Sequence, residues 1–124
     1  MPVLWLPSAD ALDVNTFPAA FDRMLMNLIE NAYRYGKPPI EIALSADGAI
    51  AEIDVLDRGA GVAIDDVERL KQPFVRGDQA RGGVMGAGLG LALVERLAQW
   101  HGGSFDLMPR VGGGTIARIR LPLA

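Results

Sequence analysis

Apolar positions recur along the chain with two different periods, and these periods predict its helices and strands. Between Thr16 and Tyr35 the apolar residues repeat about every 3.6 positions, which is typical of one buried helix face. Thr16 is expected to cap this helix, Pro18 lies in its first turn, and Gly36 is expected to end it. The predicted apolar face consists of Phe21, Leu25, Leu28, Ile29 and Ala32.

A period of two predicts strands that pair as hairpins. Asp47-Gly48 is a strong signal for the turn of a first hairpin, and the glycine run 112–114 marks the turn of a second. In the first hairpin, Asp57 has the same parity as the apolar residues of the return strand. The predicted strands are, in chain order, 3–6, 40–45, 49–56, 104–108 and 115–121.

The remaining segments add two predicted helices and a long loop. Residues 65–70 predict a short capped helix, and residues 89–100 predict a strong helix that glycines end. Residues 72–85 have no clear period, and a loop of this length is usually functional or mobile. The fold class expected from this order is an α+β two-layer sandwich, with about three helices on one face of a mixed, mostly antiparallel sheet.

Composition narrows the classes of function. The length of 124 residues predicts a single domain, 1–124, and because half of the residues are apolar we expect a packed core. The net charge of −3 and the absence of a basic stripe argue against nucleic-acid binding. The sequence has no cysteine for a disulfide or a thiolate metal site, and no apolar run of membrane-spanning length. We therefore expect a soluble, intracellular domain without direct membrane contact.

Three sequence features are candidates for a role in chemistry, and each also has an ordinary structural explanation. Asn27, Asn31 and Arg34 share one face of the first helix, which could equally be a solvated polar face. Asp57 is expected to point toward the apolar side of its strand, where a carboxylate needs a hydrogen-bond donor such as an adenine amino group. Taken alone, Asp57 fits a turn-capping aspartate better.

The alternating glycines Gly86, Gly88 and Gly90 are the third feature. Neither the P-loop pattern nor the dinucleotide-binding pattern fits them. Small residues next to a helix that starts near Leu89 would let backbone amides approach an anion. The alternative is a flexible hinge, although Gly90 inside the helix suggests a close-packing requirement.

Four motifs in this order resemble the ATP-binding catalytic domain of bacterial sensor histidine kinases, within the ATPase group that includes gyrase, the Hsp90 chaperones and MutL. They read NLIENAYRYG, DRGAGV, PFVRGDQAR and GAGLGLALV, and the resemblance extends over about 16–121. The third motif looks most like the osmosensor branch. The resemblance implies a Bergerat-type ATP-binding fold, with ATP and Mg²⁺ as cofactors.

The resemblance also assigns roles to individual residues. It implies that Asn31 and Asn27 hold Mg²⁺, that Asn27 and Arg34 are the catalytic residues, and that Arg34 approaches the phosphates. Tyr35 would pack against adenine or ribose, and Asp57 would accept from the adenine amino group. The remaining nucleotide contacts would come from Gly59, Gly61 and Val62 in the adenine wall, Phe74 and Arg76 in a lid over about 71–87, and Gly86, Ala87, Gly88, Leu89 and Gly90 near the phosphates.

Two departures from the wider group shape the expected function. Asn27 stands where the gyrase and Hsp90 branches carry a water-activating glutamate, so transfer to a partner histidine is expected in place of efficient hydrolysis. His101, the only histidine, follows the last predicted helix and is expected to be a capping or packing group. The resemblance therefore implies a phosphoryl donor to a separate dimerisation and histidine phosphotransfer domain, with a response regulator downstream.

The expected location is the cytoplasmic side of an inner-membrane sensor kinase. Two other functions stay open at this point: a stand-alone ATPase of the gyrase or chaperone type, and an interaction module that binds nucleotide without chemistry.

Overall fold

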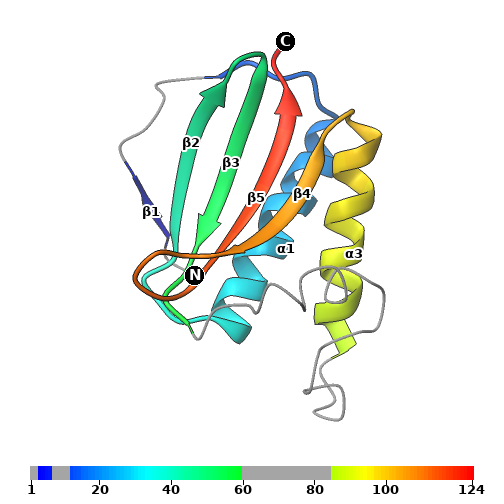
Figure 1. Cartoon of the computed structure of the whole chain (residues 1–124). Helices are drawn as coiled ribbons and strands as arrows, with labels where there is room; N and C mark the ends of the chain where they lie inside the picture. Colours follow the sequence, from blue (N-terminus) through cyan, green and yellow to red (C-terminus); the bar gives the residue numbers. More distant parts are fainter. Residues whose placement is uncertain (1–2, 7–11, 60–84) are drawn as a thin grey trace.

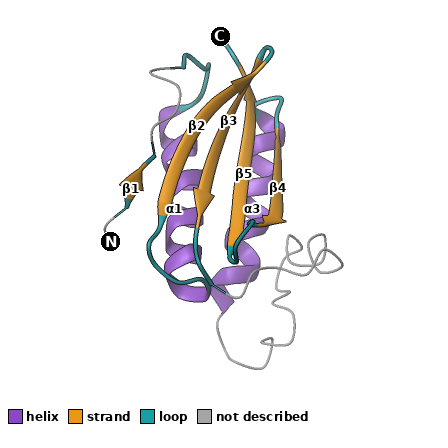
Figure 2. Ribbon diagram, turned by 60° about the vertical axis from the view of Figure 1, so that its left-hand side comes forward, coloured by secondary structure: helices purple, strands orange, loops and turns teal. Residues whose placement is uncertain are grey.

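Five strands form one mixed sheet, and two helices cover one of its faces (Figures 1 and 2). The computed structural model describes residues 3–6, 12–59 and 85–124, with the backbone alone for 85–89. The elements in chain order are β1 (Leu4–Trp5), α1 (Pro18–Tyr35), β2 (Glu41–Asp47), β3 (Ile50–Leu56), α3 (Met85–Trp100), β4 (Ser104–Pro109) and β5 (Thr115–Pro122).

The strand order across the sheet is β1-β2-β3-β5-β4. β1 runs parallel to β2 at the edge, and the other neighbouring pairs are antiparallel. Figure 2 shows α1 and α3 side by side on the same side of the sheet. This confirms the predicted α+β sandwich, whose third predicted helix, at 65–70, lies outside the described residues.

α1 forms where the apolar period predicts it and buries Met24, Leu28, Ile29 and Ala32. Its end is also as predicted, because the amide of Gly36 donates to the carbonyl of Ala32 at 2.9 Å and the chain then turns away. No helix in the described part of the chain has the length and hydropathy needed to span a membrane.

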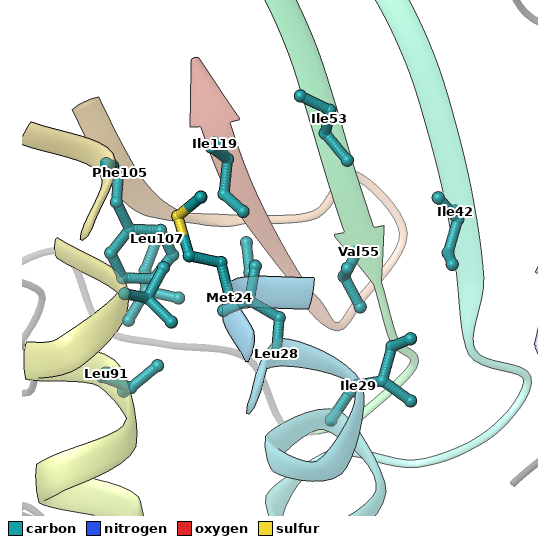
Figure 3. Close-up of a cluster of buried hydrophobic side chains, with 14 of the residues drawn as sticks. Met24, Leu28, Ile29, Ile42, Ile53, Val55, Leu91, Phe105, Leu107 and Ile119 are labelled. Atoms are coloured by element: carbon teal, nitrogen blue, oxygen red, sulfur yellow. The ribbon is translucent and has the colours of Figure 1, made fainter. Parts of the chain in front are cut away.

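The core lies between this helix pair and the sheet (Figure 3). Met24 and Leu28 of α1 point toward Phe105 of β4 and Ile119 of β5, and all four side chains are almost fully buried. Burial of a side chain of this size contributes about 2 kcal/mol. Packing against the sheet therefore stabilises α1 well beyond its intrinsic helix propensity.

The opposite face of the sheet carries paired charges. Glu52 and Asp54 alternate with the core-facing residues of β3 and are nevertheless buried. Arg118 donates to both oxygens of Asp54 at 2.8 and 2.9 Å, and Arg120 lies 2.8 Å from Glu52. Because the arginines of β5 cover these carboxylates, β3 is buried on both faces.

The start of α3 differs from the prediction. The helix begins at Met85 and not near Leu89, so Gly86, Ala87 and Gly88 belong to its first turn. The glycines do not prevent the helix from starting earlier, because each of them disfavours a helix by only about 1 kcal/mol.

The cap of α1 also differs from the prediction. Phe17, not Thr16, is the N-cap residue, and its side chain makes no capping hydrogen bond. His101, which follows α3, accepts a hydrogen bond from the Phe17 amide at Nε2 (3.2 Å), while its Nδ1 lies 2.7 Å from the Leu97 carbonyl. The expectation that His101 is a capping group is confirmed, but the helix start that it caps belongs to α1.

Replacing His101 with alanine should therefore destabilise the domain. The Phe17 amide would lose its acceptor and the rings of Phe17 and His101 would lose their edge contact, so the free energy of unfolding should fall by about 1 kcal/mol. Chemical denaturation measures this change. His101→Gln, which keeps an acceptor, should lose less; equal stability of wild type and His101→Ala would contradict the capping role.

Candidate functional site

Asp57 is the central polar residue at one end of the fold. It follows β3 directly, and it is only 7% exposed. Its Oδ1 accepts from the Gly59 amide at 2.7 Å, and its own amide donates to the Thr115 carbonyl at 3.0 Å. The burial predicted from strand parity is confirmed, and the turn-capping role is present as well.

Burial raises the pKa of the Asp57 carboxyl above its ordinary value of 3.8. Backbone hydrogen bonds from Gly59 and Thr115 and the positive charge of Arg110 act in the opposite direction, without cancelling the effect of desolvation. A carboxylate offers about four acceptor positions. Asp57 therefore has capacity left for a polar ligand group that offers a donor.

The end of α1 packs directly against this carboxylate. A Cβ atom on Gly36 would lie 2.4 Å from Cγ of Asp57, and one on Gly59 would lie 2.7 Å from Cα of Gly36. Real Cβ atoms do not approach other atoms so closely, so both positions require glycine. The terminal glycine of the first helix thus shapes the site, a role that its helix-ending signal did not reveal.

Gly36→Ala should lower the free energy of unfolding by about 2 kcal/mol, because the new methyl group overlaps the Asp57 carboxyl. The same change in an Asp57→Ala background should cost much less, since the three closest atoms belong to that side chain. Denaturant unfolding of the four proteins in this cycle measures the coupling. Equal costs in both backgrounds would place the clash elsewhere.

The turn between β4 and β5 closes the site from the other side. Gly114 has φ of +112°, and a Cβ there would lie 2.0 Å from the Asp57 carbonyl oxygen. Arg110 donates to the same carbonyl at 3.2 Å. Sequence reasoning missed both contacts, although the run of three glycines was a signal that the backbone here approaches another segment.

The polar face of α1 lies beside these elements. Asn27 and Asn31 are half-buried, whereas Arg34 and Tyr35 are exposed. Nδ2 of Asn27 is 3.5 Å from the Gly90 carbonyl of α3, so Asn27 faces the neighbouring helix and the solvated-face interpretation does not hold for it. Because the amide nitrogen points to Gly90, the amide oxygen of Asn27 is available to a ligand.

The glycine-rich segment forms the start of α3. Gly86, Ala87, Gly88, Leu89 and Gly90 all lie in α3. Among the described residues, a Cβ on Gly90 would approach no atom closer than Nδ2 of Asn27 at 4.0 Å, so these residues impose no close-packing requirement there. The first four amides of a helix lack an intrahelical partner, and here they belong to the turn that begins at Met85.

Figures 1 and 2 show these parts at the same end of the molecule. The end of α1, the end of β3, the β4–β5 turn and the start of α3 meet there. Direct contacts join Gly59 to Asp57 and Asn27 to Gly90. Asn31, Arg34 and Tyr35 lie in the second half of α1, whose end packs against Asp57. The other four predicted site residues, Gly61, Val62, Phe74 and Arg76, lie outside the described residues, as does the predicted lid before Met85.

The chain was compared with known protein families. Residues 17–124 match the model of the family described as "Histidine kinase-, DNA gyrase B-, and HSP90-like ATPase". The matched region contains all the described elements except β1, including every part of the site.

Individual proteins agree with the family match. The chain is 35% identical to the histidine protein kinase DivJ of Caulobacter vibrioides, over 90% of this chain and 19% of DivJ, so it spans about a fifth of that relative's length. Among solved structures, full-length ShkA in complex with AMPPNP is 28% identical, with a TM-score of 0.78 over 98% of this chain and 25% of ShkA. The ATP binding domain of PrrB from Mycobacterium tuberculosis is also 28% identical, with a TM-score of 0.79 over all of this chain and 83% of that domain.

Proposed function

The chain belongs to the histidine kinase-, DNA gyrase B- and HSP90-like ATPase family, and from this membership we propose that it binds Mg²⁺-ATP and donates the γ-phosphoryl group to a histidine on a separate dimerisation domain. The single observation that carries the proposal is the buried Asp57 carboxylate, held between the end of α1 and the β4–β5 turn. Full-length ShkA, a structural neighbour over almost the whole chain, binds AMPPNP, an analogue of ATP.

Asp57 recognises the adenine base in this proposal. A buried carboxylate favours a ligand that offers hydrogen-bond donors, because a desolvated acceptor without a partner costs free energy. The exocyclic amino group of adenine is such a donor. Gly59, Gly61 and Val62 would form the wall beside it, and Tyr35 would pack against the base or the ribose.

The residues of α1 fit a site for Mg²⁺. Asn27 and Asn31 are one turn apart and half-buried, and the amide oxygen of Asn27 is available because its nitrogen points to Gly90. Amide oxygens are hard, neutral ligands, and Mg²⁺ prefers oxygen. When bound, Mg²⁺ would neutralise phosphate charge. Arg34, exposed on the same helix, would approach the phosphates directly.

The amides at the start of α3 would bind the phosphates from the other side. Small residues at 86–88 leave the backbone accessible, and the positive end of the helix favours an anion. Phe74 and Arg76 would belong to a lid over the nucleotide. The chain's contribution to transfer is positioning and charge neutralisation, which are the main requirements of phosphoryl transfer.

In the transfer step, a histidine ring nitrogen forms a bond to the γ-phosphorus while the bond to the β–γ bridging oxygen breaks and ADP leaves. The histidine gives up its ring proton to solvent or to a base on its own domain. His101 is unsuited to this role, because both of its ring nitrogens already contact backbone groups. The acceptor therefore belongs to another domain, and we place this domain in the cytoplasm, with a response regulator downstream.

Calorimetric titration tests the binding half of the proposal. The isolated chain should bind ATP in the presence of Mg²⁺ and bind GTP at least about tenfold more weakly, a difference of about 1.4 kcal/mol. Equal affinity for ATP and GTP would leave Asp57 as a turn residue only. Absence of any nucleotide binding would contradict the proposed function itself.

A further inference from the structure

Two arginines bridge the Asp57 segment and the β4–β5 turn in opposite directions. Arg110, in the turn, donates through Nη1 to the Asp57 carbonyl at 3.2 Å. Arg58, next to Asp57, donates through Nη1 to the Gly113 carbonyl at 3.4 Å. The two bridges differ in environment, because the side chain of Arg110 is 10% exposed whereas Arg58 is exposed at the surface.

Glu41 fixes the orientation of Arg110. Nη2 of Arg110 lies 2.5 Å from Oε1 of Glu41, whose side chain is 15% exposed. The two terminal nitrogens of the guanidinium therefore bind two different partners: Nη2 binds the Glu41 carboxylate on β2, and Nη1 binds the Asp57 carbonyl. Charge-assisted contacts of this kind are stronger and better defined than neutral ones.

Arg110 also acts on the Asp57 carboxyl through its charge. Its positive charge lowers the pKa of Asp57, in opposition to burial. Among the residues that the structure describes, the backbones of Gly36, Gly59 and Thr115 also face Asp57, and they carry no net charge. Within the described part of the chain, Arg110 is thus the cation that favours the ionised form of Asp57.

We propose that Arg110 is a positioning residue for nucleotide recognition, which is held by Glu41 and fixes the backbone of Asp57 so that its carboxylate can meet the adenine base. This inference rests on the proposed function, because it assigns Arg110 to the same site. It adds a positioning residue outside the four sequence motifs, on the turn between β4 and β5.

The matched variants are Arg110→Gln, Arg110→Lys and Arg58→Gln. Arg58→Gln also breaks an arginine bridge between the same two segments, but its charge is not among those that shift the pKa of Asp57. Arg110→Lys keeps the positive charge but lacks the two guanidinium nitrogens that contact Glu41 and the Asp57 carbonyl. If Arg110→Gln folds poorly because Glu41 is left unpaired, the double variant Glu41→Gln/Arg110→Gln removes that buried charge.

The experiment is calorimetric titration of the full chain with Mg²⁺-ATP between about pH 8 and about pH 5. At neutral pH, Arg110→Gln should bind ATP about fivefold more weakly than wild type. As the pH is lowered, Arg110→Gln should lose its affinity for ATP at a higher pH than wild type does, because without the cation Asp57 takes up a proton more readily. Arg110→Lys should restore the wild-type pH profile, and Arg58→Gln should behave as wild type. Titration of the nucleotide phosphates is common to all variants and cancels in the comparison.

Two results would overturn the inference while the proposed function stands. One is Arg110→Gln with the affinity and pH profile of wild type. The other is an equal loss in Arg58→Gln, which would mean that any loosening of the turn weakens binding. A wild-type chain that binds no ATP is a different result, because it overturns the proposed function and this inference together.

Discussion

Asp57→Asn should weaken ATP binding at least about tenfold and remove the preference for ATP over GTP. In the proposed site the carboxylate would accept from the adenine amino group, whereas guanine presents a carbonyl oxygen at that ring position, and two facing acceptors in a buried site are disfavoured. Asparagine offers a donor as well as an acceptor, so it tolerates either base. Calorimetric titration of both nucleotides measures the change.

Asp57→Asn should not lower the stability of the domain. This result would distinguish a carboxylate that binds ligand from one that stabilises the fold. Because the pKa of Asp57 is raised in the folded state, the folded chain binds a proton more readily than the unfolded chain. The contribution of Asp57 to stability is therefore largest below the ordinary value of 3.8 and is lost as the pH rises through the raised value. Near neutral pH, Asp57→Asn should unfold at the same or a higher temperature than wild type. A clear drop in its melting temperature would indicate a structural role.

Asn31→Ala should lower the affinity for Mg²⁺-ATP at least about tenfold, or about 1.4 kcal/mol. In the proposed site the half-buried Asn31 of α1 would supply an oxygen ligand to Mg²⁺, so its loss would leave the phosphates less well neutralised. Calorimetry with and without a chelator measures the effect. With the metal removed, wild type and variant should bind ATP with similar, weak affinity.

Asn15→Ala is the matched control for this prediction. Asn15 is exposed and lies before α1, near the end of the helix that His101 caps. The substitution should leave Mg²⁺-ATP binding within about twofold of wild type, because it touches no part of the site. If Asn31→Ala binds as wild type does, Asn31 is not a metal ligand.

Much of the fold could be predicted because it follows from local patterns. The end of α1 at Gly36 and the Asp47-Gly48 turn depend on residues close together in the sequence, and the structure confirms them. The apolar face of α1 is confirmed in part, because Leu28, Ile29 and Ala32 are buried as predicted, whereas Phe21 and Leu25 are only partly buried and the buried Met24 was missed. The buried position of Asp57 followed from strand parity alone. These features are fixed by neighbouring residues that repeat with the period of a helix or a strand.

The missed features depend on contacts between distant residues. The His101 side chain caps a helix start 84 positions away, and Arg110 bonds to Asp57 across 53 positions. No local pattern carries such contacts, since they arise only when the sheet brings its turns together. For the same reason Gly36 looked like a simple helix end, although the packing of Asp57 against it requires glycine.

The central claim is that this chain donates a phosphoryl group to a histidine on another domain. The direct test is incubation of the chain with γ-labelled ATP, with and without a separately made dimerisation domain from a sensor histidine kinase that contains this chain. The isolated chain should release phosphate very slowly and remain unlabelled. The added domain should become labelled through an acid-labile, base-stable bond, as in phosphohistidine. Rapid phosphate release by the isolated chain, abolished by Glu30→Gln, with no label on the added domain, would contradict this account and indicate an ATPase.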